Sequence, residues 1–132
     1  MSNEKKITIL VADDDHDLRE QMIFFLESNG FEVVAAEGEK DALSIIEEQK
    51  FDLAVLDLMM ENQDSGFILS HKIKKLYPGT PVIIVTGVAK ETGLHFDAST
   101  REERSWIKAD AFIQKDLRFE QLKGEIDRLL KL

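Results

Sequence analysis

The chain has 132 residues, which suits a single domain with one core and leaves too little for two. Apolar residues make up 43% of the chain and charged residues 33%, a balance that excludes a disordered, collagen-like or coiled-coil protein. The net charge of −9 disfavours nucleic acid and anionic membrane surfaces as partners.

Short apolar runs alternate with longer segments of helical period along the chain. The runs are rich in β-branched residues and nearly continuous, which is typical of strands buried on both faces of a sheet. The longer segments repeat apolar residues at helical intervals, which predicts helices with one buried stripe. In chain order, the expected elements are a strand at 7–12, a helix at 15–29, a strand at 31–36, a helix at 39–50, a strand at 53–56, a helix at 66–76, a strand at 81–86, a strand at 111–114 and a helix at 117–130.

Local signals set the expected ends of several of these elements. Gly30 stands where a helix end favours a left-handed residue, and Pro78 with Gly79 stops the third helix. Asp15 is the best candidate to cap the first helix. Residues 87–108 are polar and charged, and a loop plus one helix is expected there.

Strands that alternate with helices indicate βα units and a parallel sheet covered on both faces. Right-handed crossovers are nearly obligatory in such units, so few topologies remain. The expected fold is a doubly wound α/β sandwich that forms a single domain over residues 1–132. The sequence lacks both a GxGxxG motif after the first strand and a GxxxxGK[ST] motif, which disfavours dinucleotide binding and a phosphate-binding loop.

The chain contains no cysteine, which excludes a disulfide framework, thiol catalysis and thiolate metal ligands. Its first residues, MSNEKK, lack the apolar core of a signal peptide. No apolar run approaches the roughly 18 residues of a membrane span. We therefore expect a soluble, cytoplasmic protein.

Polar side chains gather at the carboxyl ends of the predicted strands, which in doubly wound sheets meet at the edge where ligands bind. Two carboxylates about 4 Å apart repel each other by about 4 kcal/mol at an effective dielectric constant near 20. Carboxylates from two strands therefore favour either a raised pKa or a bound hard cation such as Mg²⁺. Two adjacent aspartates after a strand could simply cap a helix. The combination of carboxylates, a hydroxyl and an ammonium group at one edge is more specific to a functional site. The residues concerned are Asp13, Asp14 and Asp15 after the first strand, Asp57 after the third, Thr86 closing the fourth and Lys115 after the fifth.

Four motifs in this order resemble the response-regulator receiver domain of two-component signalling. They are ILVADDD at residues 9–15, VLD at 55–57, VTG at 85–87 and FIQK at 112–115. The resemblance covers essentially the whole chain. It implies a flavodoxin-like, five-stranded parallel sheet of order 2-1-3-4-5 with helices on both faces. It also implies a phosphoaccepting switch that is not an enzyme, apart from self-catalysed phosphoryl transfer to itself and autodephosphorylation.

By the same resemblance, Asp57 is the phosphoacceptor and takes its phosphoryl group from a histidine kinase or a histidine phosphotransfer protein. Mg²⁺ or Mn²⁺ would be held by Asp14 and Asp57, by Asp13 through water, and by the backbone carbonyl of Met59. The resemblance names no particular downstream protein target. Neither nucleic acid nor a membrane is expected as a partner of this domain.

The resemblance gives four residues a role around the phosphoryl group. Lys115 would pair with one phosphoryl oxygen, Thr86 would bond another through its hydroxyl, and Gly87 would leave the site open. Thr86 would couple to rotation of Phe112 on the fifth strand, so these two residues would form the switch. Each role has a simpler alternative: Thr86 as an ordinary strand residue, Lys115 as a solvated lysine and Phe112 as a plain core aromatic.

Several residues depart from the family's usual pattern. Glu61 stands where a proline is usual, and one extra residue precedes Gly66. Met59 places an apolar side chain near the expected phosphoryl site, where it would affect the attack of water. Asp116 replaces the proline after the lysine, so the cis peptide that normally shapes this turn should be absent. The long segment 87–108 lies where receivers commonly meet partners, so an unusual output surface is expected.

Two other functions remain open. The departures favour a pseudo-receiver, a docking module that works without phosphorylation, whereas the retained Asp57 and Lys115 favour a working receiver. A phosphohydrolase with a nucleophilic aspartate is less favoured, because Met59 occupies the place of the second acid that would protonate a leaving group. The chain fits either a stand-alone module or a piece of a larger regulator.

Overall fold

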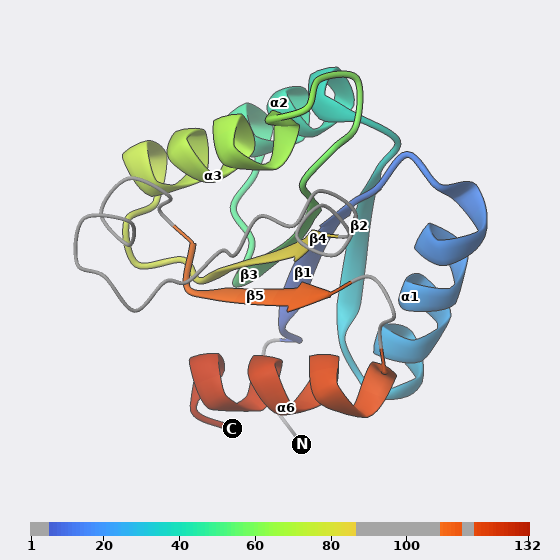
Figure 1. The fold of residues 1–132 in the computed structure, drawn as a ribbon. Helices are drawn as coiled ribbons and strands as arrows, with labels where there is room; N and C mark the ends of the chain where they lie inside the picture. Colours follow the sequence, from blue (N-terminus) through green and yellow to red (C-terminus); the bar gives the residue numbers. More distant parts are fainter. Residues whose placement is uncertain (1–5, 87–108, 115–117) are drawn as a thin grey trace.

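A parallel sheet runs through the middle of the molecule, and helices cover both of its faces (Figure 1). The computed structural model describes residues 6–86, 109–114 and 118–132. Within these ranges the sheet has five strands in the order β2-β1-β3-β4-β5, and all pairings are parallel. The predicted fold class and strand order are thus confirmed. The strands are β1 (Thr8–Ala12), β2 (Glu32–Ala36), β3 (Leu53–Asp57), β4 (Val82–Thr86) and β5 (Ala111–Gln114).

Four helices lie in the described part of the chain, two on each face of the sheet. Figure 1 shows α2 and α3 together on one face, and α1 with α6 on the other. The buried side chains divide in the same way, because α2 and α3 join one apolar cluster whereas α1 and α6 join the other. None of these helices is long and apolar enough to cross a membrane. They are α1 (His16–Ser28), α2 (Glu39–Glu48), α3 (Ser65–Leu76) and α6 (Phe119–Leu130).

The burial of the central strands explains the near-continuous apolar runs in the sequence. Every residue of β3 and β4 is buried, and so are four of the five residues of β1. Successive side chains point to opposite faces, so Leu10 and Ile84 join the core under α2 and α3, whereas Ile9 joins the core under α1 and α6. A strand that packs on both faces needs no alternating polar positions.

The predicted boundaries of the described elements hold to within two residues. The first helix begins at His16 rather than at Asp15, because Asp15 has an extended backbone with φ −81° and ψ 106°. Asp15 is its N-cap, as predicted, and Oδ1 accepts a hydrogen bond from the Leu18 amide at 3.2 Å. Gly30 has the predicted positive φ, at 90°. The helix expected within 87–108, and the peptide bond after residue 115, lie outside the described residues.

The strand register brings polar residues of three strands to one edge of the sheet. Ala12 of β1 lies beside Leu56 of β3, so Asp13 and Asp57 follow at the same level. The register between β3 and β4 leaves Thr86, the last residue of β4, one step beyond Asp57. Buried strands with a fixed register therefore set the spacing of these side chains.

The start of α3 approaches the end of β3 closely. Gly66 is buried, and its amide donates to the Leu58 carbonyl at 2.8 Å. A Cβ on Gly66 would lie 2.8 Å from the Leu58 Cα and 2.9 Å from the Asp57 carbonyl oxygen. Because both of these are backbone atoms, a larger residue would have to push the chain beside Asp57 out of place.

Gly66→Ala should lower the free energy of unfolding by about 1–3 kcal/mol, because the added methyl group overpacks this contact. Gly124→Ala in α6 is the matched control, since nothing lies within 4 Å of a Cβ at that position. It should raise the free energy of unfolding by about 0.5–1 kcal/mol, because alanine favours a helix interior over glycine. Urea unfolding measures both values, and a Gly66→Ala protein as stable as the parent would contradict the close approach.

Candidate functional site

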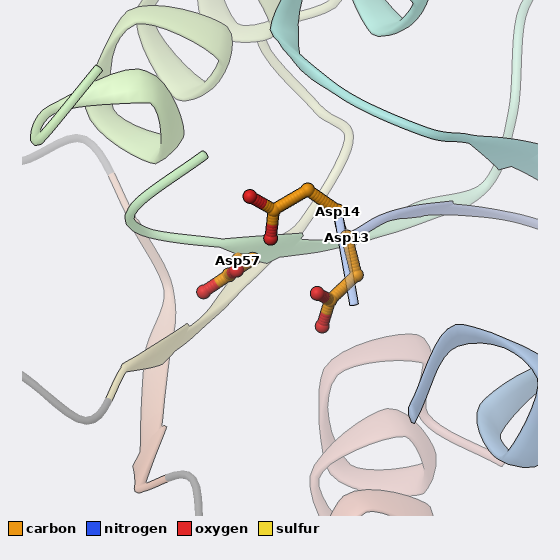
Figure 2. A group of neighbouring side chains, drawn as sticks. All are labelled: Asp13, Asp14 and Asp57. Atoms are coloured by element: carbon orange, nitrogen blue, oxygen red, sulfur yellow. The ribbon is translucent and has the colours of Figure 1, made fainter. Parts of the chain in front are cut away.

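Three aspartate side chains meet at the carboxyl ends of β1 and β3. Asp13 and Asp14 directly follow β1, and Asp57 is the last residue of β3. Each offers a carboxylate oxygen, and these oxygens all lie within 4.8 Å of one another (Figure 2). Asp13 and Asp57 are buried, with 0% and 3% of their surface exposed, whereas Asp14 is exposed. The cluster is therefore buried on one side and open to solvent at Asp14.

A buried arginine is hydrogen-bonded to the backbone of the first aspartate. This contact was not predicted from the sequence. Arg19 of α1 has only 7% of its surface exposed. Its Nη1 donates to the Asp13 carbonyl oxygen at 2.8 Å, and its Nη2 lies 3.0 Å from Nδ1 of His16. The Asp13 side chain is held as well, because Oδ1 accepts a hydrogen bond from the Asp15 amide at 2.9 Å. The feature of the sequence that could have indicated this contact is the position of Arg19, one helical turn after the acidic run.

The electrostatics of the cluster favour a bound cation. Two carboxylate oxygens 4.8 Å apart repel each other by about 3 kcal/mol at an effective dielectric constant near 20. Arg19 offsets part of this repulsion with a permanent positive charge next to Asp13. The donors are all oxygens, and Mg²⁺ is commonly held by one or two carboxylates together with waters and phosphate oxygens. The residues present therefore fit a hard divalent cation.

The predicted backbone ligand belongs to the loop after β3. The Leu58 amide donates to the Val85 carbonyl at 2.9 Å, so the strand pairing continues one residue beyond β3. Met59 follows directly and has 39% of its surface exposed. Its carbonyl therefore lies next to a fixed end of the sheet, whereas its side chain reaches solvent.

The two predicted switch residues lie on neighbouring strands. Thr86 is buried at the end of β4, and Phe112 of β5 is half-buried against the core under α2 and α3. Ile84 pairs with Phe112, and alternation along β4 places Thr86 on the same face as Ile84. Thr86 itself pairs with Gln114, so Thr86 and Phe112 occupy diagonal positions, two residues apart in register, on one face of the sheet. Gly87 and Lys115 lie outside the described residues.

Comparison with known proteins identifies a family and several relatives of this chain. The family model of the response regulator receiver domain matches residues 9–127. The transcriptional regulatory protein GlrR of Escherichia coli (strain K12) is 38% identical over 84 residues, which are 64% of this chain and 19% of GlrR. The chain thus corresponds to a minor part of that relative. An uncharacterized 14.6 kDa protein of Leptolyngbya boryana is 38% identical over 93 residues, which are 69% of this chain and 70% of that protein.

A solved structure is similar over most of the chain. It is the crystal structure of the response regulator TrrA from Thermotoga maritima in complex with Mg²⁺-BeF. Its TM-score is 0.75 at 28% sequence identity, and the match covers 94% of this chain and 99% of that chain.

Mg²⁺ should stabilise the folded chain through the three aspartates. A cation that binds only the folded state raises the free energy of unfolding by about 2.7 kcal/mol at 100 times its dissociation constant. Asp14→Asn should remove most of this gain and still fold, because Asp14 is exposed and its charge repels its two neighbours. Thermal unfolding with Mg²⁺ and with EDTA measures the gain.

Asp15→Ala is the matched control for that experiment. It removes the cap on the Leu18 amide, so it should cost about 1 kcal/mol with and without Mg²⁺. An equal gain from Mg²⁺ in the parent and in Asp14→Asn would contradict a cation site at the cluster.

Proposed function

Because the chain belongs to the family of response regulator receiver domains, we propose that Asp57 accepts a phosphoryl group from a histidine kinase or a histidine phosphotransfer protein. The observation that carries the proposal is the convergence of Asp13, Asp14 and Asp57 at the carboxyl edge of the sheet. Ligands of doubly wound sheets bind at this edge. We propose that residues 1–132 act as one such domain in the cytoplasm, without nucleic acid or membrane as a partner.

The proposed transfer uses Asp57 as a nucleophile. A carboxylate oxygen attacks the phosphorus atom of the donor phosphohistidine, so an O–P bond forms while the P–N bond breaks. The electron pair of the broken bond leaves with the imidazole nitrogen of the donor. Asp57 then carries the phosphoryl group as an acyl phosphate, which water later hydrolyses. The chain is the acceptor in this scheme, and it catalyses only its own phosphorylation and dephosphorylation.

We propose Mg²⁺ or Mn²⁺ as the cofactor, held by Asp13, Asp14, Asp57 and the backbone carbonyl of Met59. When bound, the ion supplies positive charge that neutralises the phosphoryl oxygens. The similar protein TrrA was crystallised with Mg²⁺-BeF, and the oxygen donors of this cluster suit the same ion. Lys115 would add a second positive charge by pairing with a phosphoryl oxygen.

The proposed switch uses residues of β4 and β5. Thr86 would donate its hydroxyl hydrogen to the phosphoryl group, and Phe112 would rotate in response on the neighbouring strand. Their diagonal positions on one face of two neighbouring strands support this coupling. Gly87 would leave space for the incoming donor. A downstream protein would then read the changed surface.

A docking module that works without phosphorylation is the second candidate function. The observation in its favour is Glu61, whose carboxylate accepts hydrogen bonds from the Glu39 and Lys40 amides. The loop after Asp57 is therefore held by contacts within the chain that do not involve the side chain of Asp57. A module of this kind would bind its partner equally well after Asp57→Ala.

Acetyl phosphate with Mg²⁺ should add one phosphoryl group to the chain, detected by intact mass. Asp57→Ala should abolish the adduct, whereas Asp15→Ala should keep it, because Asp15 serves as the helix cap. A parent protein that forms no adduct would favour the docking module. Sustained turnover of simple phosphate esters would instead favour a phosphohydrolase.

Met59→Asn should shorten the lifetime of the acyl phosphate. The apolar, partly exposed side chain of Met59 offers no hydrogen bond to an attacking water, whereas a carboxamide does. One added hydrogen bond of about 1 kcal/mol in the transition state corresponds to a roughly fivefold faster decay. Decay of the phosphorylated species, followed by mass, measures the rates, and equal rates would reject a role for this side chain.

A further inference from the structure

The loop between β3 and α3 is joined to the start of α2 by hydrogen bonds that run in both directions. Glu61 Oε1 accepts from the Glu39 amide at 3.0 Å, and Glu61 Oε2 accepts from the Lys40 amide at 3.3 Å. In return, Glu39 Oε1 accepts from Ser65 Oγ at 2.7 Å and from Asn62 Nδ2 at 3.0 Å. We call these four hydrogen bonds the Glu61 clamp. It joins residues more than 20 positions apart in the sequence.

The absence of a side chain at Gly38 leaves room for the Glu61 carboxylate. Gly38 is the N-cap residue of α2 and has no side chain to bond the first amides of the helix. Glu61 supplies the missing acceptors from another segment, and its negative charge suits a helix N-terminus. A Cβ on Gly38 would collide with Glu61 Oε1. The φ of Gly38, −174°, is open to any residue, so the space for Glu61 accounts for the glycine.

The loop that carries Met59 is fixed at both ends, and the Glu61 clamp holds its middle. At one end the Leu58 amide bonds the sheet, and at the other the Gly66 amide bonds the Leu58 carbonyl. Met59 lies between these ends, two residues before Glu61, and is partly exposed. A shift of the loop would therefore move the Met59 carbonyl relative to the three aspartates.

We propose that Glu61 is a positioning residue for the cation site. Its carboxylate holds the loop against α2 and thereby sets the position of the Met59 carbonyl, the proposed backbone ligand. This inference rests on the proposed function, because it takes the Met59 carbonyl as a ligand of the cation. It adds a residue that touches neither the cation nor the phosphoryl group, and that stands where the family usually has a proline.

The inference is tested by the Mg²⁺ dissociation constant, measured by calorimetry on the whole chain. Glu61→Ala should weaken Mg²⁺ binding about tenfold, the lower range for loss of a group that orients a metal ligand. Glu61→Gln should stay within about threefold of the parent, because its amide oxygen still accepts from the Glu39 amide. Glu47→Gln on α2 is the matched control: it also removes one negative charge, breaks an ion pair with Lys72 of α3, and should leave the constant unchanged.

Gly38→Ala gives an independent test without changing the loop. Its added methyl group displaces the Glu61 carboxylate, so Mg²⁺ binding should weaken about as much as in Glu61→Ala. The double variant should bind Mg²⁺ no more weakly than Glu61→Ala alone, because both changes act on one contact. Additive losses would mean that the two residues act separately and would overturn the inference.

Two further measurements follow the loss of the Glu61 contacts and its effect on the cation site. In EDTA, hydrogen exchange at the Glu39 and Lys40 amides should be faster in Glu61→Ala and in Gly38→Ala. Saturating Mg²⁺ should restore the rate of phosphorylation by acetyl phosphate in both variants, since the defect lies in affinity. A parent that binds Mg²⁺ and is phosphorylated, with variants whose Mg²⁺ affinity is unchanged, would overturn this inference alone. A parent that does neither would overturn the proposed function as well.

Discussion

The close approach of three carboxylates is the feature on which the site depends, and the sheet enforces it against their mutual repulsion. Their oxygens lie within 4.8 Å of one another, and two charges at that distance repel by about 3 kcal/mol at an effective dielectric constant near 20, more if they are closer. Asp13 and Asp57 have no freedom to separate, because they continue strands whose residues are buried on both faces and whose register is fixed. Arg19 relieves part of the repulsion by anchoring its charge beside Asp13. A hard divalent cation among these oxygens would relieve the repulsion further, which is why this edge suits the proposed cation site.

Most of the fold could be predicted because its signals are local. The strands are recognisable in the sequence as continuous apolar runs, because helices cover both faces of β3 and β4. The parallel pairing then brings their carboxyl ends together, so the polar residues at the strand ends could be predicted to lie at one site. The same reasoning identified Asp15 as a helix cap, because a cap is satisfied by an amide three residues away. The one-residue difference at the start of α1 has the same origin: a capping residue has an extended backbone and precedes the helix that it begins.

The contacts that the sequence did not reveal are those between distant segments. Nothing near Glu61 in the sequence shows that its carboxylate reaches the amides of Glu39 and Lys40. Nor does helical periodicity explain why Arg19, a charged residue, is buried, because its partner is a backbone carbonyl at the end of β1. Such contacts depend on how α1 and α2 are placed on the sheet, which local propensity does not determine. Gly38 shows the same limit: its φ is ordinary, and its significance lies in the side chain of another segment that fills the space.

A proline and the glutamate at position 61 would order the same loop by different physical means. Proline fixes its own φ and removes an amide, so the order that it gives is local and costs no contact with another element. Glu61 fixes the loop through hydrogen bonds to α2, so the order of the loop depends on where α2 lies on the sheet. These hydrogen bonds connect the position of α2 to that of the residues that follow Asp57. Thr86 and Phe112 lie on the face of the sheet that α2 and α3 cover. Under the proposed function, a phosphoryl group on Asp57 would therefore have two routes to this face, one through the sheet and one through the loop.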